Sequence, residues 1–157
     1  IGDVSGAPWL AHAASHQGIV AAEHLAGKSM HGFDRTNIPS CTYCQPQVAS
    51  VGMTEEAAVA AGRKIKVGRY PFRPLGKAMA IGETEGIVKL VFDEKYGELL
   101  GAHIIGSEAT ELIAELGLAR ALEATNEELF RTIHAHPTLS EAIMEAAGDA
   151  FGQAINI

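Results

Sequence analysis

The segment GIVKLVFDEKYGELLGAHII, at residues 86–105, decides the fold because it holds two strand patterns joined by a short turn. Residues 86–93 and 98–105 are rich in Val, Ile and Leu, which favour the pleated, half-buried surface of a sheet. Glu94-Lys95-Tyr96-Gly97, which lies between them, is typical of a hairpin turn. The segment therefore predicts two neighbouring antiparallel strands.

Further strand patterns lie on the N-terminal side of this hairpin. Residues 41–44 and 48–51 are two short strand candidates, and residues 64–72 alternate apolar and charged side chains, as one face of a strand does. Between them, Thr54 followed by two glutamates predicts the start of a short helix, because a Thr N-cap and first-turn carboxylates both stabilise that end. Gly62 is expected to end this helix.

The last third of the sequence is helical. Ser107 is expected to cap one helix, and Thr125 with Glu128 has the spacing of a capping box for a second helix that ends near Ile133. A final helix is predicted over residues 139–152. Strands followed by a run of helices indicate an α+β fold, in which helices pack on one face of an antiparallel sheet.

The first residues have a different pattern. Residues 8–26 predict a helix rich in alanine, which Gly27 ends, and the polar residues 28–39 predict a linker. The chain opens with Ile-Gly-Asp, inside what we interpret below as a motif, so we expect it to belong to a larger protein. We assign residues 1–35 and 36–157 to two different domains.

Composition excludes several classes of function. The 157 residues are 47% hydrophobic and 20% charged, as in a globular domain, and the net charge is −7. A negative chain argues against general binding to a phosphate backbone or an anionic membrane, so we expect neither nucleic acid nor membrane partners. No charged-then-apolar pattern of the kind expected of a leader opens these residues, and no stretch reaches about 20 apolar residues. We expect a cytoplasmic location.

The run His134-Ala-His136-Pro137-Thr-Leu-Ser-Glu141 is the strongest candidate for chemistry. Pro137 keeps His136 from continuing the preceding helix, and the Glu141 carboxylate is close enough in sequence to reach the imidazole. A carboxylate that orients a histidine is the arrangement of general acid–base catalysis. The alternative is structural, because Thr138 and Glu141 also have capping-box spacing, and spacing alone does not separate the two.

Cys41 and Cys44 form a lone C-x-x-C motif. We interpret them as ordinary buried or half-buried cysteines, because β-forming residues surround them and strand alternation places them on opposite faces. We expect no metal site. The alternative is a site shared with the C-terminal histidines, and a second would use the histidines of the first helix, His12, His16 and His24.

Taken together, these segments resemble the flavin-dependent pyridine nucleotide-disulfide oxidoreductases, and within that family the dihydrolipoamide dehydrogenase group. Residues 1–14 resemble the family's second FAD motif, and residues 46–52, 84–89 and 100–106 resemble its interface domain. Residues 134–141 resemble its terminal His-x-His-Pro-Thr-x-x-Glu signature. The resemblance runs nearly from end to end, and the order of the motifs makes it specific.

The resemblance implies a cofactor role for the first domain. Asp3 would accept hydrogen bonds from the ribityl hydroxyls of FAD. Leu10, Ala11 and His12 would face the flavin pyrimidine, where a helix N-terminus favours negative charge on the reduced ring. The parent enzyme would also use NAD. The sequence contains neither the glycine-rich FAD motif, the redox C-x-x-x-x-C nor a nicotinamide-binding unit, and in relatives these lie upstream.

The resemblance also implies a homodimer formed by the second domain. His136, held by Glu141, would enter the partner's active site and take a proton from a dihydrolipoyl thiol. A lipoyl domain of a 2-oxo acid dehydrogenase complex or of the glycine cleavage system would then be the partner of the parent enzyme. By itself the present chain would be inactive. The alternatives are a self-associating module without catalysis and a glutathione- or mercuric-type flavin reductase.

Overall fold

The computed structural model describes residues 1–28 and 33–156, so part of the predicted linker, with His31, lies outside the described residues. The chain divides into two compact units, Ile1–Ile38 and Pro39–Ile157. Within the described ranges, no helix has both the length and the apolar character that crossing a bilayer requires.

The first unit is built around helix α1, Ala11–Leu25. The helix begins three residues later than the sequence pattern predicts, because Leu10 has the extended backbone of an N-cap residue. Gly27 adopts a φ of 68° after the helix, as predicted for a residue in the left-handed region. The Gln17 side chain accepts a hydrogen bond of 2.7 Å from the Gly2 N–H, so α1 holds the Ile-Gly-Asp turn in place.

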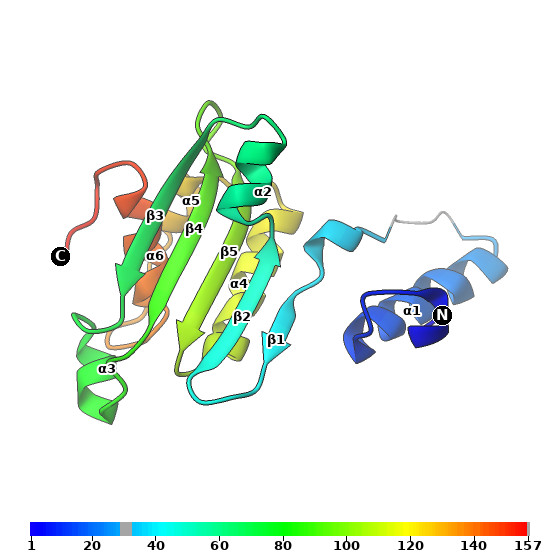
Figure 1. The fold of residues 1–157 in the computed structure, drawn as a ribbon, viewed down its shortest axis with the longest axis horizontal. Helices are drawn as coiled ribbons and strands as arrows, with labels where there is room; N and C mark the ends of the chain where they lie inside the picture. The colour runs from blue at the N-terminus through cyan, green and yellow to red at the C-terminus, as the bar shows by residue number, and fades with distance from the viewer. Residues whose placement is uncertain (29–32, 157) are drawn as a thin grey trace. The chain divides into compact units, whose positions relative to one another are not determined.

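The second unit contains a five-stranded antiparallel sheet with the strand order β1-β2-β5-β4-β3 (Figure 1). The predicted hairpin is confirmed as β4 and β5, in which Val88 pairs with Ile104 and Leu90 with Ala102. The strands are β1 Ser40–Thr42, β2 Gln47–Gly52, β3 Ile65–Pro71, β4 Ile87–Asp93 and β5 Leu99–Gly106.

The β4–β5 turn is held by its own side chains. The Asp93 carboxylate accepts hydrogen bonds from the Lys95 N–H at 3.0 Å and the Tyr96 N–H at 2.8 Å. Gly97 then takes a φ of 73°, which a side chain would strain, and its N–H donates to the Asp93 carbonyl. The register of the two central strands is therefore fixed locally.

Three helices cover one face of the sheet, as predicted: α4 Ala109–Ala121, α5 Asn126–Arg131 and α6 Glu141–Asp149 (Figure 1). The main core lies between them and the strands, and its largest buried side chains are Phe72, Leu90, Phe92, Leu99, Ile104, Leu116 and Ile143. Helix α2, Glu55–Ala60, packs its buried Ala58 against Val91 and Leu100 in a smaller, separate cluster.

In the second unit the structure also differs from the predicted helices. Helix α3, Gly76–Ile81, is missed because no side chain caps it and it is only six residues long. Helix α4 is preceded by Glu108, with a φ of 58°, so the predicted Ser107 cap is wrong. Helix α6 is shorter than the predicted 139–152, because the residues before it form the loop that carries the candidate site.

Helix α6 lies directly against strand β3. A Cβ atom added to Gly68 would be 1.8 Å from the carbonyl oxygen of Ala146, which is far inside van der Waals contact. The backbones of the helix and the strand approach this closely only because residue 68 has no side chain. This contact fixes how closely α6, which carries Glu141 and Glu145, approaches β3.

Candidate active site

His136 lies in the loop between α5 and α6, and its peptide bond to Pro137 is cis. Its imidazole is 74% exposed, and its Nδ1 atom is 2.9 Å from the Glu141 Oε1 atom. An ionised carboxylate accepts hydrogen bonds and donates none. The Nδ1 atom therefore carries the proton in this contact, and Nε2 is the ring nitrogen left to accept. The two residues that sequence spacing singled out are therefore in contact, with the basic nitrogen available to an incoming group.

Glu141 is the first residue of α6, and both of its oxygens are engaged. Oε1 contacts His136, and Oε2 accepts a hydrogen bond of 2.9 Å from the Thr138 N–H. The carboxylate therefore makes both contacts that spacing allows, but no capping box forms. The Thr138 hydroxyl donates to the Ala135 carbonyl, and the N-cap of α6 is Ser140, whose side chain makes no capping hydrogen bond. Burial raises the pKa of Glu141, but the hydrogen bonds from Thr138 and His136 and the nearby histidines outweigh it, so the net pKa is lowered. The carboxylate stays ionised near neutral pH.

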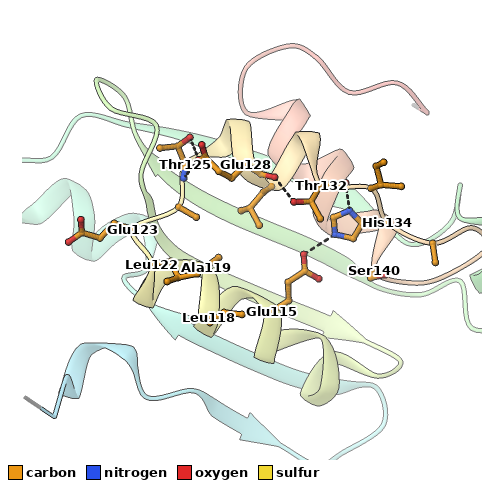
Figure 2. A pocket seen from close by; sticks show the side chains of 14 residues that line it. Glu115, Leu118, Ala119, Leu122, Glu123, Thr125, Glu128, Thr132, His134 and Ser140 are labelled. Carbon is orange, nitrogen blue, oxygen red and sulfur yellow. Dashed lines mark hydrogen bonds and ion pairs between the residues drawn. The ribbon is translucent and has the colours of Figure 1, made fainter. Parts of the chain in front are cut away.

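A second histidine pair, which sequence spacing did not predict, anchors the same loop. The His134 Nε2 atom is 2.8 Å from the Glu115 Oε1 atom on α4, and its Nδ1 atom is 2.9 Å from the Thr132 carbonyl oxygen (Figure 2). The side chain of His134 is only 5% exposed. Both ring nitrogens face acceptors, so this arrangement favours the imidazolium form. The loop is thus tied to α4 two residues before the exposed His136.

The pKa of His134 is raised, chiefly by the hydrogen bond to Glu115, against the opposing effect of burial; the charges of Glu115 and Glu141 add to the rise. A raised pKa in the folded state means that the pair stabilises the fold fully below the unfolded pKa of about 6.5. This stabilisation is lost as the pH rises through the folded pKa.

We expect His134→Gln to lower the free energy of unfolding by about 1–3 kcal/mol at mildly acid pH, the value of a hydrogen bond to a charged group. The difference from the wild type should shrink as the pH is raised. Denaturant titrations at a series of pH values measure it, and a difference that grows with pH would contradict the imidazolium assignment.

A groove of about 780 Å³ runs beside this pair, between α4, α5 and the loop (Figure 2). Its wall and rim include Leu118, Leu122 and Ile133, all of which are exposed, and Ile133 is 97% exposed. Apolar side chains grouped on an otherwise polar surface are typical of an interaction site.

A smaller pocket of about 210 Å³ contains the dyad itself. His136 and Glu141 line it on one side, and Tyr70, Leu75 and Gly76 line it from β3 and the segment that follows. The volume is below the roughly 300–1,000 Å³ typical of pockets for drug-sized ligands, so only a narrow group fits next to the imidazole.

The four residues assigned to FAD lie in the first unit. Asp3 and the first-turn residues Ala11 and His12 are exposed, and Leu10 is half-buried. No side chain caps α1, so the N-terminal end of this helix keeps the polarity that attracts negative charge. Gln17 of α1 holds the backbone next to Asp3 through its hydrogen bond with the Gly2 N–H. The exposed Asp3 carboxylate could accept hydrogen bonds from flavin hydroxyls, and the start of α1 suits the polar edge of a flavin ring.

The cysteines differ from the prediction in part. Cys41 is half-buried, and burial raises the pKa of its thiol, against a hydrogen bond from Tyr43 that lowers it. Cys44 is exposed, because it lies in the β1–β2 turn rather than in a strand. Across the described part of the chain, no three His, Cys, Asp or Glu residues are grouped closely enough to hold a metal ion.

Comparisons with known proteins agree with this architecture. Residues 38–147 match the model of the pyridine nucleotide-disulphide oxidoreductase dimerisation domain. The chain is 54% identical over 157 residues to dihydrolipoyl dehydrogenase from Rhizobium etli, covering 99% of this chain and 33% of that protein. It is 52% identical over 156 residues to dihydrolipoyl dehydrogenase from Bacillus subtilis, with coverages of 99% and 33%.

Solved structures show the same fold. LpdA from Mycobacterium tuberculosis superposes with a TM-score of 0.88 at 27% identity, covering 93% of this chain and 32% of that one. The HOCl-induced flavoprotein disulfide reductase RclA from Escherichia coli gives a TM-score of 0.88 at 26% identity, covering 94% and 34%. The chain spans about a third of the length of the curated relatives it matches. It belongs to the pyridine nucleotide-disulphide oxidoreductase family and carries that family's dimerisation domain, of the kind found in dihydrolipoyl dehydrogenases.

Proposed function

We propose that this chain supplies the acid–base dyad of a dihydrolipoyl dehydrogenase, acting in the active site of a partner subunit. The observation that carries the proposal is the exposed His136 imidazole, whose Nδ1 lies 2.9 Å from the ionised Glu141 carboxylate. His134, whose two ring nitrogens both bond within the fold, buries its ring, whereas the ring of His136 is exposed. An exposed ring that is oriented by a half-buried carboxylate is suited to proton transfer with a second molecule.

In this role Nε2 of His136 takes a proton from a dihydrolipoyl thiol. The resulting thiolate attacks one sulfur of the enzyme's redox disulfide, so that one S–S bond forms, one breaks and the other enzyme sulfur leaves as a thiolate. The second substrate thiol then attacks the substrate sulfur of the mixed disulfide, which breaks that bond, and its proton passes to an enzyme thiolate. This completes a two-electron transfer and releases the oxidised, cyclic lipoyl group. Glu141 stabilises the imidazolium that forms after the first proton transfer, because its charge lies next to Nδ1.

The partner is a second copy of this chain, bound through the apolar groove along α4 and α5. The family's name for this domain implies a homodimer, and the exposed Leu118, Leu122 and Ile133 provide apolar area that a second copy would cover. The loop between α5 and α6, which contains His136, lines the same groove with His134 and Ala135. A second copy bound in the groove would therefore lie close to His136.

The family's properties support proposals for the remaining parts of the enzyme. We assign residues 1–35 to the end of an FAD-binding domain, in which Asp3 and the start of α1 would hold the flavin. Bound FAD would supply the route for electrons from the disulfide to NAD, whose own site lies outside these residues. A lipoyl domain would deliver the substrate, and we propose a cytoplasmic location. The present chain alone, without the disulfide, would be inactive.

The test uses the full-length protein with FAD, which should oxidise dihydrolipoamide with NAD. The double variant Leu118→Glu/Leu122→Glu should raise the dimer Kd by about 30-fold or more, the effect of removing a central apolar anchor. Because each site lacks its histidine without the partner, turnover should fall in proportion to the dimer fraction that sedimentation measures.

Val59→Glu is the matched control, because Val59 is an exposed apolar residue on α2, away from the groove. It should leave both the dimer and the turnover unchanged. A monomeric groove variant that oxidises dihydrolipoamide at the wild-type rate would refute action across subunits, and a wild-type protein without this activity would refute the assignment.

A further inference from the structure

The buried carboxyl group of Glu145 has no part in the dyad, although it lies on the same side of α6. It is four residues after Glu141, the spacing that places two side chains on one helix face, and both line the small pocket. Glu145 is 1% exposed. A buried carboxylate needs strong compensation, because removing its charge from water is costly.

That compensation comes from the segment that follows α6. The Glu145 carboxylate accepts hydrogen bonds from the Ile155 N–H at 2.8 Å, from the Asn156 N–H at 3.3 Å and from the Asn156 side-chain amide at 2.6 Å. No ion pair to Glu145 is found within the residues that the structure describes. Hydrogen bonds from the amide groups of residues 155 and 156 therefore stabilise the buried carboxylate, as an ion pair with a cation would.

Tyr70 on β3 also holds the segment that follows α6. Its hydroxyl donates to the carbonyl oxygen of Asn156. Burial, with the charges of Glu145 and Glu141, raises the pKa of Tyr70, so the phenol keeps the proton that it donates. Asn156 is thus held through its N–H, its carbonyl and its side chain, and it forms a wall of the pocket that contains His136.

We propose that Glu145 is a positioning residue that pins Asn156 beside the dyad and so shapes the space in which a thiol meets His136. The proposal rests on the function proposed for the dyad. Glu145 touches neither the imidazole nor, in this scheme, the substrate; it acts through residues 155 and 156. The pinned wall keeps the pocket narrow, which suits the slender end of a dithiol and disfavours bulkier thiols.

The experiment compares Glu145→Gln, Asn156→Ala and the double variant in the full-length protein. In Glu145→Gln, one acceptor oxygen becomes an NH₂ group that faces N–H donors, so amide hydrogen exchange at residues 155 and 156 should speed up by about tenfold or more. The KM for dihydrolipoamide should rise by about tenfold with little change in kcat, because the loss is in binding rather than in proton transfer.

If Glu145 acts through Asn156, the double variant should raise KM no further than the larger single effect. Glu94→Gln, in the exposed β4–β5 turn, is the matched control and should change neither quantity. Unchanged exchange at residues 155 and 156 would overturn the attachment, and faster exchange with an unchanged KM, or additive effects, would overturn the positioning role. The exchange result holds whether or not His136 is the base, so failure of the dyad itself would be recognised separately.

Discussion

Replacing His136 with Gln should lower the rate of dihydrolipoamide oxidation by about 10²–10⁴-fold, the contribution typical of a general acid–base residue. Gln cannot take a proton at neutral pH, although its amide can still donate to Glu141. The substrate thiol would then have to ionise without help, and free thiols have a pKa of about 8.5. The residual rate should therefore rise as the pH approaches that value.

The same variant should keep its ability to pass electrons from NADH to an artificial dye, because that route bypasses the thiol. Steady-state rates with the two acceptors, measured on the same preparation, separate loss of the base from loss of the flavin site. His103→Gln is the matched control, since His103 lies in β5 and its ring contacts the Met53 carbonyl oxygen at 3.1 Å. Full dihydrolipoamide turnover in His136→Gln would exclude this residue as the base.

The second large effect is on stability. Gly68→Ala should lower the free energy of unfolding by about 3 kcal/mol, at the upper end of the range for overpacked interiors. The added methyl group would lie 1.8 Å from the Ala146 carbonyl oxygen, so α6 has to move away from β3. Since α6 carries Glu141 and Glu145, the same change should also weaken dihydrolipoamide turnover in molecules that remain folded.

Denaturant unfolding of the variant measures the first effect. Gly117→Ala is the control, because a methyl group at this position meets no atom within 4 Å beyond its chain neighbours and the nearby backbone of α4 itself. Ala also favours helix over Gly by about 1 kcal/mol, so this variant should unfold at a slightly higher denaturant concentration. If Gly68→Ala unfolded at the wild-type midpoint, α6 would not be packed against β3 as the structure places it.

Local patterns predicted most of the fold. The strand pair around residues 94–97 and the capping box at Thr125 and Glu128 are found where the sequence indicates them, because the signals act over a few neighbouring residues. Helix α3 has no such signal and forms in its tertiary context. The close approach of Gly68 to α6 is a contact between residues far apart in the chain, and no local sequence pattern near Gly68 predicts it.

In the candidate site, too, contacts between residues close in sequence are predictable and contacts between distant residues are not. His136 and Glu141 are five residues apart, and a proline between them makes their contact predictable from spacing. Glu115 is 19 residues from His134 and on another helix, so their pair depends on how α4 packs next to the loop. Glu145 has no sequence feature that distinguishes it from a surface glutamate, and only the position of residues 155 and 156 shows its role.

The two-sided engagement of Glu141 has a consequence for engineering. One oxygen accepts the Thr138 N–H just before α6 and the other contacts the imidazole. Under the proposed function, local stability and the rate of proton transfer would both depend on this single side chain. If Glu141 orients the catalytic imidazole as proposed, replacing it to stabilise the start of α6 is expected to slow turnover. Improvements have to come from elsewhere, such as exposed positions on α2, where the two demands are not shared.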